Sequence, residues 1–187
     1  MNKNKIIVID IEATCWDGKI PPGQVSEIIE FGICVLDTES GEIEKNKGIL
    51  VKPERSEVSS FCTELTTITQ DLLDKEGVSF EEACNQLRKT YNSKEYVWAS
   101  YGLYDLKMIK NQCNIRNIEY PLSQEHINVK ELFREVKGMS RKVGMKGALA
   151  ILNIPLEGTH HRGVDDAKNI AKVLHWSLKN KKEAERI

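Results

Sequence analysis

The chain has 187 residues, of which 40% are hydrophobic, and its 27 basic and 28 acidic residues give a net charge of -1. This composition excludes a disordered chain, and the length suits one compact domain. The absence of a basic excess argues against a protein that coats nucleic acid by neutralising phosphates. We predict one domain over residues 1–187, with a core from about residue 5 to 178 and a charged tail at 179–187.

The cysteines and the N-terminal apolar run both bear on location. There are five cysteines, an odd number without a C-x-x-C pair, which indicates buried thiols in a reducing compartment. The apolar run from Ile6 to Ile9 is too short for a signal peptide or a membrane span. We therefore expect a cytoplasmic protein.

The first part of the chain has the pattern of strands. Ile6 to Ile9 is a β-branched run typical of a buried strand, and residues 28–36 read as a second one. A turn at Asp37 to Gly41 leads into a third strand, roughly Ile43 to Val51. These three segments predict a meander.

Helices and strands alternate in the rest of the chain. Ser79 and Glu82 form a capping box ahead of a helical pattern that reaches Tyr91. Short strands are predicted at 96–99 and 127–129, and further helices at 106–113, 132–136, 145–152 and 167–178. A meander followed by alternating strands and helices predicts an α/β domain with a mixed sheet.

Asp10 and Glu12 are the first residues that suggest chemistry. They stand two apart at the end of an apolar strand, so both side chains project from the same face of the sheet. Two neighbouring carboxylates are unfavourable without a positive partner, and a hard divalent cation is a natural one. A solvated strand end is the alternative, since this short pattern is common.

Two later segments also carry candidate residues. Asp105 stands at the start of a predicted helix, where capping and the helix dipole alone would favour an aspartate. Asp166 stands at the start of the last predicted helix, with His161 five residues before it in a polar loop. His160 is adjacent to His161 but does not fit that spacing.

Taken in order, these residues resemble the DEDDh superfamily of 3′-to-5′ exonucleases, to which the proofreading subunit of bacterial DNA polymerase and the RNase T-like enzymes belong. Residues 10–15, 26–32, 61–70 and 161–169 are similar to the branch of Eri1, the three-prime histone exonuclease and the KapD-like bacterial proteins. That branch usually has Leu-Thr-Gly-Ile where this chain has Leu65-Thr66-Thr67-Ile68. The similarity covers nearly the whole chain.

The resemblance implies a ribonuclease H-like mixed β-sheet flanked by α-helices. It also implies two Mg²⁺ or Mn²⁺ ions on Asp10, Glu12, Asp105 and Asp166, with His161 as general base. Residues just after the glutamate contact the terminal nucleotide in related enzymes, which suggests Ala13 and Thr14 here. Leu65, Thr66 and Tyr104 are further candidates beside the terminal base, because aromatic and apolar faces stack bases without sequence preference.

The implied activity is release of nucleoside 5′-monophosphates from a single-stranded 3′ end, with RNA preferred. Two alternatives stay open at this point. One is a DNA-directed or broad-specificity exonuclease, because the same metal site serves both nucleic acids. The other is a regulatory, KapD-like protein that keeps the fold without cleavage, although all four carboxylates and the histidine are present.

Overall fold

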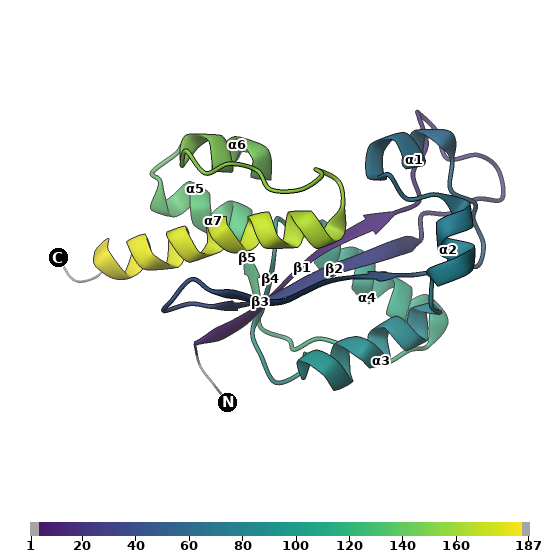
Figure 1. Cartoon of the computed structure of the whole chain (residues 1–187), viewed down its shortest axis with the longest axis horizontal. Helices are drawn as coiled ribbons and strands as arrows, with labels where there is room; N and C mark the ends of the chain where they lie inside the picture. Colours follow the sequence, from purple (N-terminus) through teal and green to yellow (C-terminus); the bar gives the residue numbers. More distant parts are fainter. Residues whose placement is uncertain (1–3, 185–187) are drawn as a thin grey trace.

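A five-stranded mixed sheet organises the chain, whose computed structural model describes residues 4–184 (Figure 1). The strand order is β3-β2-β1-β4-β5. The antiparallel part comprises β1 (Lys5–Ala13), β2 (Ile28–Asp37) and β3 (Ile43–Leu50). The parallel part adds β4 (Trp98–Ser100) and β5 (His126–Asn128) beside β1. The predicted mixed sheet is confirmed.

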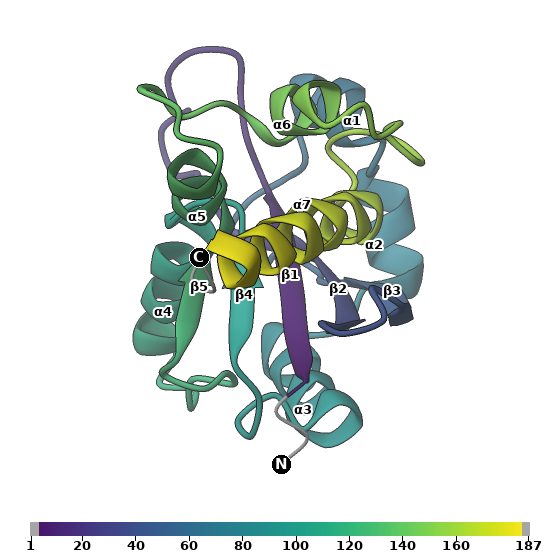
Figure 2. The same cartoon turned by 90° about the vertical axis from the view of Figure 1, so that its left-hand side faces the viewer.

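Helices cover both faces of the sheet. One face carries α3 (Phe80–Tyr91) and α4 (Tyr104–Arg116). The other carries α5 (Val129–Val136), α6 (Met145–Ile151) and α7 (Gly163–Ala184), and α7 lies across β1 and β2 (Figure 2). Two short helices, α1 (Ser60–Thr66) and α2 (Gln70–Glu76), pack beside the far ends of β1 and β2 (Figure 1).

Side-chain alternation along β1 explains these layers. Ile7, Ile9 and Ile11 pack into the core under α3 and α4, whereas Ile6 and Val8 pack into the core under α7. Because successive strand residues point to opposite faces, Asp10 and Glu12 continue the row that faces α7. The apolar half of the strand thus fixes which face its carboxylates occupy.

Helix caps account for the elements that periodicity alone did not predict. Ser79 caps α3 by accepting a hydrogen bond from the Glu82 backbone, as predicted. Ser59 and Thr69 cap α1 and α2 in the same way. Their serine and threonine side chains start two helices of seven residues each, too short to show a clear period.

Element bounds differ modestly from the prediction. The first strand continues past Asp10 to Ala13, and the last helix begins four residues earlier than predicted, at Gly163, and extends to Ala184. Residues 179–184 of the predicted tail are therefore helical, and 185–187 lie outside the described residues. Within residues 4–184, no helix combines the length and apolar character that crossing a membrane requires.

Candidate active site

Three carboxylates from opposite ends of the chain meet beside β1. Oxygens of Asp10, Glu12 and Asp166 lie within 4.8 Å of one another. Glu12 is 9% exposed and Asp166 4% exposed, so little water can screen their charges. The first turn of α7, which carries Asp166, lies next to the end of β1 (Figure 1). This donor set fits a hard divalent cation.

Asp105 approaches the same place from α4. It is 5% exposed, and its Oδ1 accepts a hydrogen bond of 3.1 Å from the backbone N–H of Ile11. Asp105 therefore joins the helix to β1 between the two strand carboxylates. The N-cap position of α4 is Leu103, so Asp105 is in the first turn and is not the cap itself.

Asp166 also holds the loop that carries the histidines. Its Oδ2 accepts hydrogen bonds of 2.9 Å from the backbone N–H of His161 and 2.9 Å from Nδ1 of His160. The two imidazoles stack with their centroids 3.9 Å apart. Sequence spacing singled out His161 and passed over His160, whose contact with Asp166 depends on the fold of the loop. His161 has φ of 65°, an uncommon backbone conformation for a non-glycine residue.

Crowded negative charge dominates the electrostatics of this site. Burial, followed by repulsion from Asp105, Glu12 and Asp166, raises the pKa of Asp10 well above its ordinary value. Burial and repulsion from Asp166 raise the pKa of Glu12 to about 9. Burial also raises the pKa of Asp105. Carboxyl groups that resist ionisation when left alone are what a bound cation would stabilise as carboxylates.

The pKa of His161 is shifted in the opposite direction. Burial, followed by the neighbouring His160, lowers the pKa of His161, while the charge of Asp166 opposes that change. A lowered pKa keeps the imidazole neutral near pH 7, which is the form that can accept a proton.

A buried ion pair lies next to the cluster. Glu30 on β2 is fully buried directly opposite Glu12, and its carboxylate accepts hydrogen bonds from the Arg162 guanidinium at 3.2 and 3.3 Å and from the Gly163 backbone at 2.8 Å. Arg162 thereby supplies positive charge to a region with five acidic side chains. Neither residue was predicted as part of the site, although a glutamate within the apolar stretch 28–36 was a usable signal.

The described architecture can be compared with known proteins. A family model for exonucleases, RNase_T, matches residues 7–174. The chain belongs to this exonuclease family. It is 34% identical over 178 residues to 3′-5′ exoribonuclease 1 of Rattus norvegicus, covering 90% of this chain and 51% of that protein. The chain thus spans about half the length of the first curated relatives it matches.

Shorter relatives of the family match along most of their length. The chain is 27% identical over 188 residues to the probable 3′-5′ exonuclease KapD of Bacillus subtilis, covering 100% of this chain and 90% of KapD. The nuclease domain of 3′hExo, a DEDDh family member solved with rAMP bound, superposes with a TM-score of 0.85 and 32% identity. That match covers 95% of this chain and 93% of the other. The predicted exonuclease fold is confirmed.

The residues predicted to hold substrate fall into two groups. Leu65 and Tyr104 are 37% and 59% exposed, and Ala13 is half-buried, so all three have surface to offer. Thr14 and Thr66 are 1% and 0% exposed, so their side chains are buried, and their contact with a nucleotide stays a prediction.

Internal hydrogen bonds satisfy the hydroxyl groups of the two buried threonines. The Thr14 hydroxyl donates to the Val25 carbonyl and accepts from the Glu27 backbone, which joins β1 to the start of β2. The Thr66 hydroxyl donates to the Cys62 carbonyl and accepts from the Ile68 backbone, which closes α1. Both hydroxyl groups are thus used within the fold.

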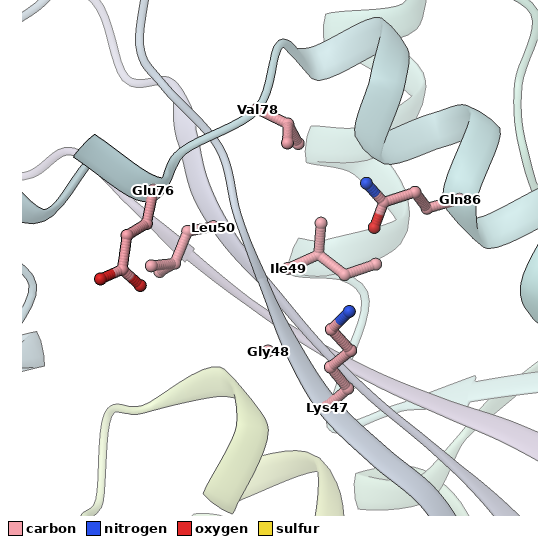
Figure 3. A pocket seen from close by; sticks show the side chains of 7 residues that line it. All are labelled: Lys47, Gly48, Ile49, Leu50, Glu76, Val78 and Gln86. Atoms are coloured by element: carbon pink, nitrogen blue, oxygen red, sulfur yellow. The ribbon is translucent and has the colours of Figure 1, made fainter. Parts of the chain in front are cut away.

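A separate hollow of about 230 Å³ lies beside the edge strand β3 (Figure 3). It is lined by β3, the end of α2, the segment that follows it and α3, and it contains none of the predicted site residues; its lining residues are Lys47, Gly48, Ile49, Leu50, Glu76, Val78 and Gln86. The carboxylate cluster of Asp10, Glu12 and Asp166 lies outside this hollow.

Proposed function

We propose that this chain is a 3′-to-5′ exoribonuclease that releases nucleoside 5′-monophosphates from single-stranded RNA 3′ ends. The observation that carries the proposal is the meeting of Asp10, Glu12 and Asp166 within 4.8 Å, with His161 hydrogen-bonded through its backbone to Asp166. Asp10, Glu12, Asp105 and Asp166 would hold two Mg²⁺ or Mn²⁺ ions. Bound there, such ions would supply charge stabilisation to both the attacking and leaving oxygens of an in-line displacement.

His161 then acts as the general base. Its neutral imidazole accepts the proton of the attacking water, and its lowered pKa keeps it in the accepting form at neutral pH. Asp166 fixes the backbone at this residue and leaves the imidazole free of that hydrogen bond. The same carboxylate therefore couples the cation site to the position of the base.

Leu65 and Tyr104 hold the terminal base in this proposal. They are among the few exposed large hydrophobic side chains, and they come from α1 and from the first turn of α4, next to Asp105. Apolar and aromatic faces stack bases without strong sequence preference. An exonuclease that proceeds along a strand needs that tolerance.

RNA is the proposed substrate because of the named relatives. The rat relative is a 3′-5′ exoribonuclease, and one matched structure, with 32% identity and a TM-score of 0.84, concerns recognition of a histone mRNA stem-loop 3′ end by a 3′-exonuclease. RNA and DNA have the same phosphodiester group, so the carboxylate cluster alone does not distinguish them. Cleavage rates on the two nucleic acids decide the preference.

Matched RNA and DNA oligonucleotides of one sequence, each labelled at the 5′ end, test the proposal. With Mn²⁺ the RNA should shorten stepwise from its 3′ end and faster than the DNA, and chelator should stop the reaction. Asp10→Asn should be inactive at equal folded concentration. Faster shortening of DNA would move the assignment to a DNA-directed enzyme, and no shortening of either would support a non-catalytic role.

We also propose that the protein is cytoplasmic. Its support is that all five cysteines are free thiols, four of them buried. Fluorescence microscopy of the tagged chain in its host tests the location, and a signal confined to the cell envelope would contradict it.

A further inference from the structure

Thr67 has a backbone conformation that its side chain disfavours. It follows the last residue of α1 with φ of 61° and ψ of 7°, in the left-handed region. A β-branched residue there is a steric outlier, because its Cβ substituents crowd the adjacent carbonyl. Glycine or asparagine would adopt this conformation at lower cost. A strained residue that persists needs a compensating interaction.

Closing α1 does not require the Thr67 hydroxyl. The Thr67 backbone N–H donates to the Thr63 carbonyl, which any non-proline residue could do. The hydroxyl of Thr66 caps the same turn by bonding both Cys62 and Ile68, and the hydroxyl of Thr63 donates to the Ile68 carbonyl. The Thr67 side chain is therefore free to serve another part of the molecule.

That other part is the loop that carries the histidines. The Thr67 Oγ1 accepts a hydrogen bond of 3.3 Å from Nη1 of Arg162, 95 residues later in the chain. The Nε and Nη2 groups of the same guanidinium donate to the buried carboxylate of Glu30. The planar fork of one arginine thus joins the α1–α2 turn to β2, with its own backbone directly after His161.

We propose that Thr67 is a positioning residue for the general base. Its hydroxyl fixes the outer edge of the Arg162 guanidinium, and Glu30 fixes the inner edge. The loop from His160 to Gly163 is thereby held against the turn that follows α1, the helix that carries Leu65. Proton transfer from water needs His161 within a few tenths of an ångström of its working position, so a loosened Arg162 reduces turnover. This inference rests on the proposed exonuclease activity.

Thr67→Gly and Thr67→Asn test the role as a matched pair. Both residues relieve the backbone strain, but only asparagine keeps a side-chain oxygen that can accept from Arg162. Thr67→Gly should melt at or above the wild-type temperature, while its kcat falls roughly tenfold, the size of one lost hydrogen bond to a charged group. Its KM should stay near wild type. Thr67→Asn should also melt at or above wild type but retain kcat.

A purely structural role makes a different prediction. If Thr67 only ended a helix, both variants would retain or raise activity together with melting temperature, and that result would overturn the inference. Equal loss of kcat in both variants would overturn it as well, since the acceptor oxygen would then be irrelevant.

Arg162→Lys provides the partner test. A lysine can stay with Glu30 as a point charge but lacks the fork that reaches Thr67 at the same time. In this background Thr67→Gly should cause no further loss of kcat, because interacting residues are not additive. A full additional tenfold loss would refute the link. Inactive wild-type protein with every oligonucleotide would instead refute the proposed function, and the melting temperatures would remain interpretable.

Discussion

His161 allows the most direct test at the level of a single residue. Because its pKa is lowered from 6.5, kcat should be flat near pH 7 and fall at lower pH, with a midpoint below 6.5. The sign follows from the role, since the neutral imidazole accepts the proton and protonation removes activity. His161→Ala should lower kcat about 10²- to 10⁴-fold and abolish this acid limb.

Two controls for the role of His161 come from the loop before α7 and from α7 itself. The backbone N–H of His161 makes the hydrogen bond to Asp166, so His161→Ala should keep its melting temperature and metal affinity. His175 also lies on α7, the helix of Asp166, but packs against Gly41. His175→Gln should therefore cause no loss of kcat. A fully active His161→Ala protein would remove the residue from the mechanism.

Leu65 and Tyr104 should affect binding more than turnover. Replacing either by alanine removes a stacking surface, and each lost contact costs about 1–3 kcal/mol of affinity. We expect KM for single-stranded RNA to rise roughly 5- to 150-fold with kcat nearly unchanged, measured by initial rates. Ile115→Ala is the matched control, since Ile115 is 61% exposed on the same helix as Tyr104. A similar rise in KM for Ile115→Ala would mean that general apolar surface is being measured.

The close approach of α7 to β2 is the feature that matters most among the elements. A Cβ at Gly32 would lie 1.8 Å from backbone atoms of Gly163, so only glycine lets the helix start this close to the sheet. Gly32→Ala should push the first turn of α7 outward and move Asp166 away from Asp10. We predict loss of more than about 100-fold in kcat and a lower melting temperature.

Gly147→Ala is the counterpart within α6. Its Cβ would meet Val143 at 3.4 Å, an ordinary contact, and alanine favours the helix by roughly 0.5–1 kcal/mol. Activity should stay constant and the melting temperature should rise slightly. Both variants would be compared by thermal melting in circular dichroism and by oligonucleotide cleavage. Loss of activity in Gly32→Ala alone would show that the close contact with α7 requires glycine.

The elements that sequence reasoning predicted are those with strong local patterns. The apolar run 28–36 and the capping box at Ser79 both specify their structures locally, and both are found. The helices α1 and α2 were not predicted, because helices of only seven residues each carry no clear period. The conformation of Thr67 could not be predicted either, since threonine is the wrong residue to signal a positive φ.

At the scale of the whole molecule, the carboxylate cluster should make stability depend on pH and metal. The pKa of Glu12 is raised from 4.5 to about 9, and that of Asp10 is also raised. Between pH 4.5 and about 9 these carboxyl groups ionise in the unfolded chain before they ionise in the folded one. Their contribution to stability is therefore fully present at low pH and is lost as pH rises. In chelator the melting temperature should therefore fall from about pH 5 to 9, and Mn²⁺ should restore it most at high pH.

A single substitution checks the origin of this effect. Asp10→Asn in chelator at pH 8 should melt above wild type, by roughly 2–4 °C for each kcal/mol of relieved repulsion. Asp37→Asn is the control with opposite sign, because hydrogen bonds from Ser40 and Glu39 lower the pKa of Asp37. An Asp10→Asn protein that melts below wild type without metal would contradict the electrostatic account.

The candidate site shows the same limit of sequence reasoning on a larger scale. Spacing along the chain singled out Asp10, Glu12, Asp166 and His161, and the fold brings them together. It could not show that Thr14 and Thr66 turn inward, or that Glu30 and Arg162 complete the charge balance, because those facts depend on contacts between distant segments.

The meeting of β1 and α7 has a consequence for synthesis of the chain. Asp166 comes 154 residues after Glu12, so the ribosome must make almost the whole domain before the carboxylate cluster can close. A nascent chain that ends before residue 161 has Asp10 and Glu12 but neither His161 nor Asp166. Under the proposed function, an unfinished copy is therefore harmless to the messenger RNA from which it is being translated, and cleavage begins only once the last helix has docked.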